Sequence, residues 1–335
     1  MELARDFSIG ISIEPISACN LDCMFCGCSA LQDGSRIDAG RILSALNDIE
    51  QSRYPIEKIV YTGLGEPLLY DDLPTITTAL KKRVNINHIA IFTNGLLLTP
   101  DRAEALIRAG VSHFLISLTG LTVDVFSMFQ GGNQAHGRAG ILLNTIQHNV
   151  QKLCEARDRF NNKIYVGINY ILTEDSRTEF FQCLDYYRQI GVDWIQTMIL
   201  RGSDHYYGRL EESGIPYKMP VLPLKDTEEV SITDSRYITR LTEHVKEMKG
   251  WLCSIVGLSM QITSTGEVYA CCERHDETLL GNIHDADLVD LINSDKLEKL
   301  VESLHRTYDQ IPQCCATCVT ARSLLASAYK DRFTM

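Results

Sequence analysis

Short apolar runs rich in β-branched residues alternate with longer stretches of helical spacing through about residue 200, and this alternation limits the fold more than any other feature. The runs typical of strands are 9–13, 57–62, 86–93, 111–117, 163–172 and 193–200. The stretches with helical spacing are 39–53, 71–82, 100–109, 140–158 and 176–190. Gly110 and Gly191 precede strands and are typical helix stops. Six strand–helix units in series predict a parallel sheet with helices outside.

Length and charge narrow the class of protein further. The chain has 335 residues, 45% of them hydrophobic, so we expect an α/β domain of roughly 200 to 250 residues with a smaller appendage. The net charge of −11 argues against a nucleic-acid partner, because phosphate binding needs a basic surface. No run approaches the about 18 apolar residues of a membrane span, and residues 1–6 lack the form of a signal peptide. We therefore expect a cytoplasmic protein that does not bind membranes.

Three cysteines follow the first predicted strand with the spacing C-x3-C-x2-C, at Cys19, Cys23 and Cys26. Three thiolates hold three corners of a cubane iron–sulfur cluster and leave the fourth iron open to another ligand. A structural zinc site is the alternative, but the next cysteine, Cys28, is too close in sequence to complete a good tetrahedron. With twelve cysteines and no sign of export, metal or redox use is favoured over disulfides.

The loop Cys19-Asn-Leu-Asp-Cys23-Met-Phe-Cys26 resembles the signature of the radical S-adenosylmethionine (SAM) superfamily. The resemblance implies that SAM chelates the open iron of a 4Fe-4S cluster. It also implies that an electron from the cluster cleaves SAM to methionine and a 5′-deoxyadenosyl radical, which takes hydrogen from a C–H bond. Such enzymes commonly use a partial (β/α)6 barrel, in agreement with the six predicted units. In such barrels, ligands gather at the carboxyl ends of the strands.

The second predicted strand runs into Tyr61-Thr-Gly-Leu-Gly-Glu-Pro67, which resembles the glycine-rich motif of this family with Leu64 in place of one glycine. A glycine such as Gly65 lets the backbone come close to the amino group of SAM. Glu66 either accepts a hydrogen bond from that group or holds the loop. The position after a strand favours a functional reading over a simple turn.

Other strand ends supply further candidates. The resemblance assigns Thr93, Asn94, Ser117 and Asn169 to contacts with the ribose or carboxylate of SAM. Each of these residues is also typical of turns or strand caps, so both interpretations stay open. Phe25 is expected to pack near the adenine or to shield the cluster.

Six more cysteines follow the last barrel strand, at Cys253, Cys271, Cys272, Cys314, Cys315 and Cys318. Two short apolar segments flank Ser264-Thr-Gly266 and predict a hairpin that delivers Cys271. The order of these cysteines resembles the Twitch domain, the short form of the SPASM domain, which holds one auxiliary 4Fe-4S cluster. A zinc site built from four of the six thiols is the alternative that spacing alone permits.

The Twitch resemblance assigns Cys253, Cys271, Cys315 and Cys318 as cluster ligands, with the choice inside each Cys-Cys pair open. We expect three parts: a radical SAM barrel core at 1–200, a connector with a substrate-facing loop and a helix at 201–250, and a Twitch-type domain of a β-hairpin plus helix at 251–335. Cys154 and Cys183 lie on helical patterns whose apolar faces should bury them.

Radical SAM enzymes with such tails modify ribosomal peptides or small molecules such as aminocyclitols and aminosugars. The first strand begins near residue 9, which leaves no room for the N-terminal leader-binding module of many peptide modifiers and favours a small substrate. The cysteine spacing is similar to that of the 2-deoxy-scyllo-inosamine dehydrogenases of aminoglycoside antibiotic biosynthesis. We expect attack on a carbinol-type C–H of a sugar or aminocyclitol, with an external reductant such as flavodoxin or ferredoxin.

Epimerisation and dehydrogenation share the first hydrogen abstraction. An epimerase needs a hydrogen-atom donor, and Cys272 is our candidate; it is otherwise a buried thiol or the true ligand in place of Cys271. A dehydrogenase needs an electron acceptor, which the auxiliary cluster would supply. The loop after the sixth strand offers Asp204, His205 and Tyr206 as substrate contacts, or is a solvated loop with aromatic anchors. The segment 129–133 is also expected to face the substrate.

Overall fold

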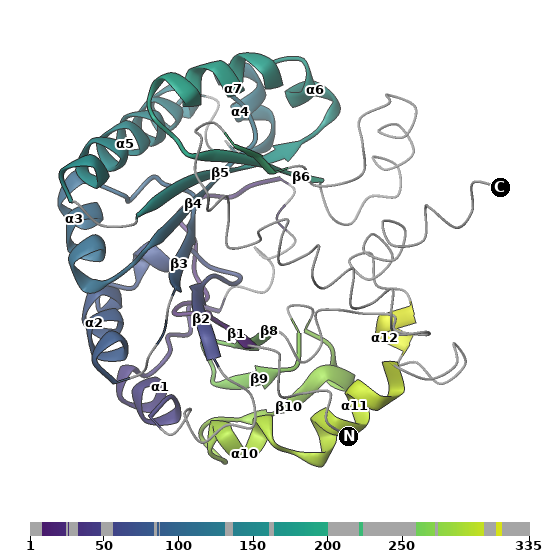
Figure 1. The fold of residues 1–335 in the computed structure, drawn as a ribbon. Helices are drawn as coiled ribbons and strands as arrows, with labels where there is room; N and C mark the ends of the chain where they lie inside the picture. Colours follow the sequence, from purple (N-terminus) through teal and green to yellow (C-terminus); the bar gives the residue numbers. More distant parts are fainter. Residues whose placement is uncertain are drawn as a thin grey trace.

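Six parallel strands form the centre of the computed structural model (Figure 1). It describes residues 9–24, 26, 33–47, 56–83, 86, 88–130, 137–160, 164–199, 221–223, 259–271, 274–304 and 313–316. The central strands are β1 (Ile9–Ile13), β2 (Ile56–Tyr61), β3 (His88–Thr93), β4 (His113–Leu118), β5 (Tyr165–Leu172) and β6 (Trp194–Ile199). Each pairs in parallel with the next, which confirms the predicted partial barrel.

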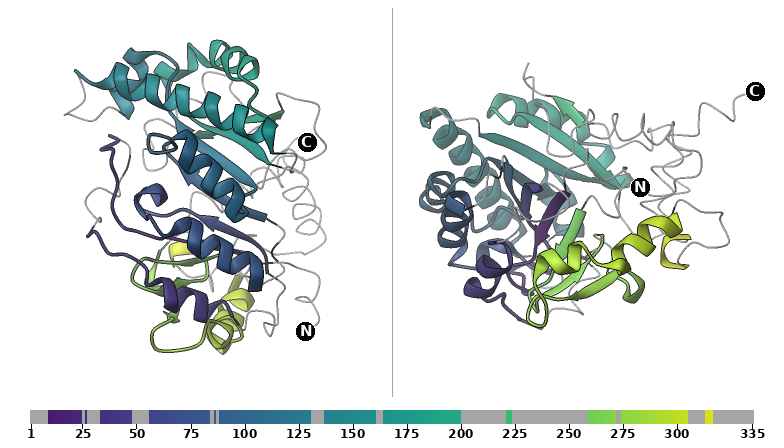
Figure 2. Two further views of the ribbon diagram at one scale, coloured as in Figure 1. Left: turned by 90° about the vertical axis from the view of Figure 1, so that its left-hand side faces the viewer. Right: turned by 60° about the horizontal axis from the view of Figure 1, so that its bottom comes forward.

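Helices cover one face of this curved sheet (Figures 1 and 2). They are α1 (Ala39–Ala45), α2 (Leu73–Arg83), α3 (Pro100–Ala109), α4 (Val123–Phe129), α5 (Ala139–Arg159), α6 (Glu174–Arg177) and α7 (Phe180–Gln189). The Thr99 side chain caps α3 by accepting from the Arg102 N–H, and Pro100 stands at the first helical position. Gly110, with φ of 112°, ends the same helix as predicted.

Helix α4 was not expected, and its last residue begins segment 129–133. Its seven residues are too few to show a clear helical period, but Thr122 caps the first turn through the Val125 N–H. Phe129 ends the helix and is buried, as is Gln130. The Phe129 carbonyl accepts from the Met24 N–H of the cluster loop at 2.9 Å. The expectation that segment 129–133 faces the substrate stays a prediction, and residues 131–133 lie outside the described residues.

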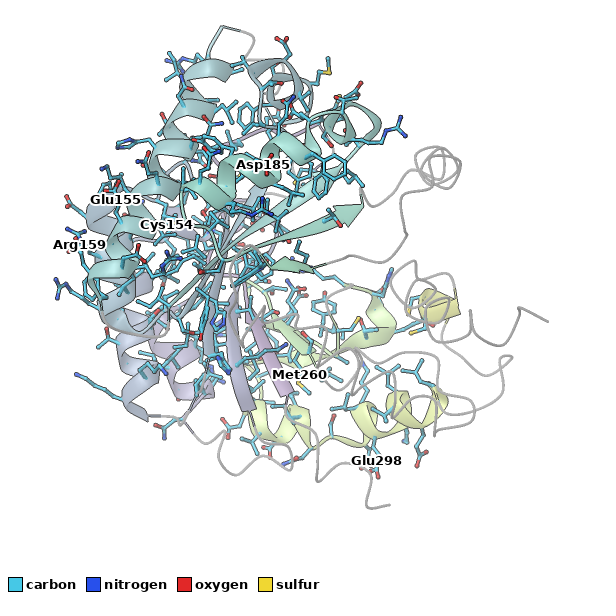
Figure 3. All side chains as sticks on the ribbon, turned by 45° about the horizontal axis from the view of Figure 1, so that its top comes forward. Cys154, Glu155, Arg159, Asp185, Met260 and Glu298 are labelled. Atoms are coloured by element: carbon cyan, nitrogen blue, oxygen red, sulfur yellow. The ribbon has the colours of Figure 1, made fainter. Side chains whose placement is uncertain are left out.

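The two faces of the sheet bury different cores. On the helix-covered face, strand and helix side chains form the main apolar core. Cys154 of α5 is buried in it, whereas Glu155 and Arg159 lie on the exposed face of the helix (Figure 3). Cys183 is also buried, so both cysteine predictions are confirmed. On the inner face a smaller core surrounds Trp194.

Aromatic side chains close the amino-terminal end of the barrel. The His113 ring stacks on Tyr165 with 5.0 Å between centroids, and Trp194 lies near both rings. Gly167 on β5 makes room for Trp194, because a Cβ at this position would lie 2.3 Å from the indole. The open end of the barrel is therefore the carboxyl edge of the strands.

The C-terminal part of the chain extends the barrel sheet. Strand β8 (Ser259–Ile262) pairs in parallel with β1, and β9 (Glu267–Tyr269) and β10 (Leu279–Asn282) follow antiparallel. The predicted hairpin is confirmed, with Gly266 at φ of 86° in its turn. We expected this hairpin in a domain beside a six-stranded barrel; the structure instead joins it to the barrel in one ten-stranded sheet.

The remaining elements in the described residues are one short edge strand and five helices. Strand β7 (Val221–Pro223) pairs antiparallel with β6, inside a segment expected to be a loop-rich connector. The short helices are η4 (Pro67–Leu69), η5 (Asp276–Thr278), α10 (Leu288–Ile292), α11 (Asp295–Leu304) and α12 (Gln313–Ala316). Within the described ranges, no helix combines the length and the apolar character that a membrane crossing requires.

Candidate active site

The three N-terminal cysteines lie on the loop that leaves the carboxyl end of β1. The Cys26 N–H donates to the Cys23 carbonyl at 2.9 Å, and the Leu21 N–H donates to Cys19 Sγ at 3.5 Å. Burial raises the pKa of Cys23, and the neighbouring charges of Cys19 and Cys26 raise it further. This electrostatic coupling indicates that the three thiols share one site.

The donor set fits an iron–sulfur cluster better than a single ion. No three His, Cys, Asp or Glu side chains in the described part of the chain converge at the distances of one metal ion. A cubane cluster does not need its thiolates to converge on one atom, because each thiolate ligates a separate iron. Cys19, Cys23 and Cys26 would hold three such atoms.

Asn94 ties the end of β3 to the cluster loop. Its Nδ2 donates to Asn20 Oδ1 at 2.8 Å and approaches Cys19 Sγ at 3.8 Å, while its Oδ1 accepts from the Leu96 N–H at 3.0 Å. An amide that donates to a ligand sulfur stabilises the thiolate and tunes the metal site. The predicted contact between Asn94 and SAM stays a prediction, and the structure adds this supporting role.

Glu66 holds the glycine-rich loop against β3. Its Oε1 accepts from Thr93 Oγ1 at 2.7 Å and from the Leu68 N–H at 3.0 Å, and its Oε2 accepts from the Asn94 N–H at 2.8 Å. Of the two roles weighed for Glu66, the structure therefore displays the loop-holding one. Burial raises the pKa of this carboxyl group, against the three donors that lower it.

Gly65 packs directly on the cluster loop. A Cβ at this position would lie 2.1 Å from the Ile16 carbonyl oxygen and 2.6 Å from that of Ala18. The neighbouring Glu66 N–H donates to the Ala18 carbonyl at 2.8 Å. The glycine is thus needed because two backbone segments meet here. The glycine-rich loop at residues 63–66, expected to bind SAM and called the SAM loop below, and the cluster loop are held as one unit.

Ser117, Asn169 and Gln196 form a polar row across three neighbouring strands. They are register partners on β4, β5 and β6, on the inner face of the barrel. Asn169 is only 3% exposed, and its Oδ1 has no hydrogen-bond partner among the described residues. A buried amide oxygen without a donor is costly, so the row is built to receive one from a bound molecule. The predicted contacts of Ser117 and Asn169 with SAM stay predictions, and this unmet acceptor is consistent with them.

Sequence reasoning missed Gln196 and Glu14. Gln196 could have been found from the alternation along β6, since it shares a face with Trp194. Gln130 was included in the segment expected to face the substrate, but its contacts were not predicted. It accepts from the Thr119 N–H at 2.8 Å and donates to the Ser117 carbonyl at 3.1 Å, and so fixes the end of β4. No local pattern indicates these contacts, because the partners lie more than ten residues away.

Glu14 follows β1 and is almost fully buried, at 1% exposure. Its Oε2 accepts from the Leu64 N–H at 2.5 Å and forms an ion pair with Arg274. Its Oε1 accepts from Ser264 Oγ at 2.9 Å. A carboxylate at the end of an apolar strand is unusual enough to have been noticed from sequence, but its arginine partner is 260 positions away.

Part of the predicted auxiliary site is described. Cys271 is buried at the end of the hairpin, and the Sγ atoms of Cys314 and Cys315 lie 3.8 Å apart. The Cys314 N–H donates to Glu277 Oε2 at 3.0 Å, and burial raises the pKa of the Cys314 thiol to about 11. The choice between Cys314 and Cys315 as ligand stays open.

The other predicted site residues lie outside the described residues. They are Phe25, Asp204, His205, Tyr206, Cys253, Cys272 and Cys318.

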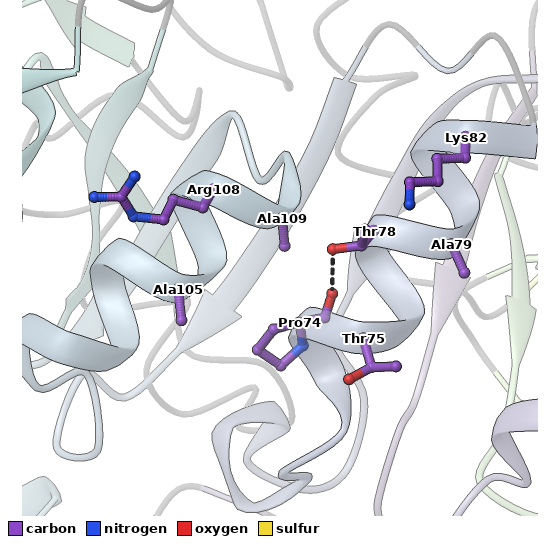
Figure 4. A pocket seen from close by; sticks show the side chains of 8 residues that line it. All are labelled: Pro74, Thr75, Thr78, Ala79, Lys82, Ala105, Arg108 and Ala109. Atoms are coloured by element: carbon purple, nitrogen blue, oxygen red, sulfur yellow. Dashed lines mark hydrogen bonds between the residues drawn. The ribbon is translucent and has the colours of Figure 1, made fainter.

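A surface groove of about 610 Å³ lies between α2 and α3 (Figure 4). Its lining residues are Pro74, Thr75, Thr78, Ala79, Lys82, Ala105, Arg108 and Ala109. No predicted site residue is among them, and both helices belong to the layer outside the sheet. The candidate active site is therefore the carboxyl edge of the barrel strands and not this groove.

Comparison with solved structures shows the class of fold. The structure of anSMEcpe with bound AdoMet has a TM-score of 0.64 and 16% identity, covering 97% of this chain and 92% of that one. SuiB of Streptococcus suis bound to S-adenosylmethionine has a TM-score of 0.59 and 17% identity, covering 89% of this chain and 66% of that one. BtrN in complex with AdoMet and 2-DOIA has a TM-score of 0.50 and 16% identity, covering 94% of each chain.

The fold and the three-thiol site thus define an enzyme of the SAM-binding iron–sulfur class. Residues 13–206 match the radical SAM superfamily, and residues 253–319 match SPASM, an iron–sulfur cluster-binding domain. The chain belongs to the radical SAM superfamily. Its cofactors are SAM, a SAM-binding 4Fe-4S cluster and an auxiliary iron–sulfur cluster in the SPASM region.

Curated relatives match a smaller part of the chain. A probable GTP 3′,8-cyclase of Methanococcus aeolicus is 30% identical over 191 residues, 55% of this chain and 56% of the relative. The GTP 3′,8-cyclase of Clostridium acetobutylicum is 35% identical over 127 residues, 37% of this chain and 39% of the relative. The chain spans about half or less of the length of these relatives. Both carry the name GTP 3′,8-cyclase, and neither is named as an aminoglycoside-modifying enzyme of the kind to which we compared the cysteine spacing.

Proposed function

We propose that this radical SAM enzyme acts on a carbinol-type C–H of a small polyhydroxylated substrate, an amino sugar or aminocyclitol, and inverts that carbon. The observation that carries the proposal is the uncharged inner face of the barrel, where Gln196 on β6 continues the row of Ser117 and Asn169, the two residues assigned to SAM. Hydroxyl and amide groups pair well with the hydroxyls and amines of such a substrate. A strongly anionic substrate would instead need cationic side chains.

When bound, SAM and its cluster supply the radical that removes a hydrogen atom from the substrate. The protein must then return a hydrogen atom from the opposite face. We assign this step to Cys272: its S–H bond breaks, the substrate C–H bond forms, and a sulfur-centred radical is left on the cysteine. One electron from an external one-electron reductant and one proton from solvent restore the thiol.

The sequence position of Cys272 supports this assignment. Cys272 directly follows Cys271, which is buried just after β9 and which the Twitch resemblance assigns as an auxiliary-cluster ligand. A cysteine thiol is suited to the donor role because its S–H bond is weak. Cys272 itself lies outside the described residues.

Dehydrogenation of the same carbon is the alternative outcome. After the first hydrogen is removed, the substrate would lose its hydroxyl proton to a base and one electron to an acceptor, for which the auxiliary cluster is suited. This route leaves a carbonyl and takes up no hydrogen from the protein. It needs no role for Cys272 as a donor.

Two other substrate classes come from the comparisons. The GTP 3′,8-cyclases favour a purine nucleotide, and anSMEcpe with bound Cp18Cys peptide and SuiB bound to precursor peptide SuiA favour a peptide. A triphosphate is disfavoured by the net charge of −11 and by the use of Arg274 as the partner of Glu14. A peptide-modifying enzyme ranks third because the polar row does not require a peptide backbone.

The deciding experiment incubates the anaerobically reconstituted enzyme with SAM and dithionite in deuterated water. Separate reactions contain a panel of aminoglycosides and aminocyclitols, GTP, or short peptides. We expect 5′-deoxyadenosine together with one deuterium in an isomeric product of the first panel. A product lighter by two hydrogens would indicate dehydrogenation, and turnover of GTP or peptide alone would contradict the proposal.

The cysteine variants test the donor. We expect Cys272→Ala to retain cluster iron and SAM cleavage but to give no isomerised product. Cys183→Ala is the matched control, because Cys183 is a thiol of α7 buried in the main core on the helix-covered face of the sheet. Loss of iron in Cys272→Ala would make Cys272 a ligand and would refute the donor role.

A further inference from the structure

The Glu14 carboxylate joins three parts of the chain that are far apart in sequence. It follows β1, contacts the glycine-rich loop through the Leu64 N–H, and contacts the C-terminal region through Ser264. Arg274, three residues after Cys271, forms the third contact as an ion pair. Ser35, beyond the cluster loop, adds a hydroxyl contact of 2.6 Å to Ser264.

The SAM loop rests directly on this carboxylate. Gly63 has φ of 154°, and a Cβ built there would lie 2.4 Å from Glu14 Oε2. The Leu64 N–H donates to the same oxygen at 2.5 Å. The position of Glu14 therefore determines where the backbone of residues 63–65 lies. Gly65 in turn packs against the cluster loop.

Such a buried carboxylate needs a cationic partner to keep both its charge and its place. Glu14 is 1% exposed, so an unpaired charge there would be strongly disfavoured. Arg274 supplies the partner charge, and its side chain is only about one-fifth exposed, at 21%. Without it the buried carboxylate would be displaced toward water, and the Leu64 N–H would lose the contact with Glu14.

We propose that Arg274 is a positioning residue for SAM binding, contributed by the C-terminal region and acting through Glu14. It sets the SAM loop without touching SAM. The auxiliary-cluster region thus helps to build the SAM site of the barrel, in addition to holding its own cluster. The proposal concerns SAM binding alone and does not depend on which substrate the enzyme uses.

The test compares Arg274→Gln with Arg274→Lys in reconstituted full-length enzyme. Iron and acid-labile sulfide are measured first, and SAM affinity is then measured by equilibrium dialysis and by the change that SAM produces in the EPR signal of the reduced cluster. We expect the glutamine variant to keep its iron and to bind SAM at least tenfold more weakly. The lysine variant, which keeps the positive charge, should recover most of the affinity.

Arg157→Gln is the matched control. Arg157 forms a comparably buried ion pair with Asp193 at 2.8 Å, at the opposite, amino-terminal edge of the strands. We expect this variant to melt at a lower temperature and to bind SAM as the wild type does. A general loss of stability would lower affinity in both arginine variants, whereas the proposed role affects Arg274→Gln alone.

Unchanged SAM affinity in an Arg274→Gln enzyme with full iron content would overturn the proposal. If that variant fails to fold or to retain iron, Ser264→Ala decides, because it removes the second support of Glu14 without stranding a charge. We expect Ser264→Ala to weaken SAM binding by about threefold to fivefold. Wild-type affinity in Ser264→Ala would then refute the positioning role.

Discussion

Individual polar side chains hold the loops together at the open end of this barrel. Glu66 alone satisfies the Leu68 and Asn94 N–H groups and the Thr93 hydroxyl. Asn169 shows the opposite state, since its buried oxygen lacks a donor among the described residues. Glu66 therefore holds neighbouring backbone segments in place, whereas Asn169 has an acceptor oxygen that a ligand can use.

The Glu66→Gln variant should be less stable than the wild type. The amide retains one acceptor oxygen, and its NH2 group must face at least one of the three donors that the carboxylate now accepts from. We expect a loss of about 1–3 kcal/mol in unfolding free energy, typical of a buried donor left unsatisfied. Chemical denaturation measures it, and a variant as stable as the wild type would show that the loop is held by other contacts.

His113 makes stability depend on pH. Burial and the neighbouring His88 lower its pKa to about 3, below the ordinary value near 6.5 of an unfolded chain. As the pH falls below about 6.5, His113 therefore becomes protonated in the unfolded state but stays neutral in the folded state. Stability from this residue is complete above that pH and decreases below it, by about 1.4 kcal/mol at pH 5.5.

Denaturant unfolding of the wild type and of His113→Phe at pH 7.5 and 5.5 checks this sign. The phenylalanine ring keeps the stacking position and cannot take up a proton. The advantage of the wild type over the variant should shrink by about 1.4 kcal/mol between the two pH values. A constant difference would mean that His113 titrates alike in both states.

At the scale of strands and helices, glycine positions show where elements touch. Gly167→Ala places a Cβ against the Trp194 ring, at 2.3 Å in the present geometry. We expect a cost of about 1–3 kcal/mol, seen as a lower melting temperature. Gly137→Ala is the control, because nothing lies within 4 Å of its added Cβ. Equal melting temperatures for the two variants would contradict the packing described here.

The contact between the SAM loop and the cluster loop predicts an effect on iron content. Gly65→Ala would push a methyl group into the Ile16 carbonyl, 2.1 Å away, and so displace the loop that carries Cys19. We expect about four irons per chain in place of about eight, with the auxiliary cluster retained. Iron analysis with EPR distinguishes the clusters, and a full complement of iron would show that the cluster loop adapts to the methyl group.

Local patterns predicted the elements well and their partners poorly. The β-branched runs located β1 to β6, and Gly110 and Gly191 marked helix ends, because these signals lie within a few residues. Helix α4 was missed because seven residues show too little periodicity. The pairing of β8 with β1 and of Glu14 with Arg274 joins positions about 250 residues apart, and no local signal encodes such contacts.

For the whole molecule, the joined sheet means that the barrel and the C-terminal region are not independent. A chain cut to residues 1–250 would leave β1 without β8, and Glu14 without Ser264 and Arg274. Because an unpaired strand edge invites aggregation, we expect this truncated chain to be insoluble or aggregated. Size-exclusion chromatography with circular dichroism measures the result, and a monomeric folded fragment would support the separate domain boundaries predicted from the sequence.

The pairing of β1 with β8 also sets an order of events on the ribosome. The strand made first keeps one edge open until residue 262 has emerged, and at about 5–20 residues per second this takes tens of seconds. Arg274, the partner of Glu14, is synthesised later still, 260 positions after it. The N-terminal thiols are thus translated early into a loop that its neighbours cannot yet hold, so insertion of the first cluster is expected to follow completion of the chain.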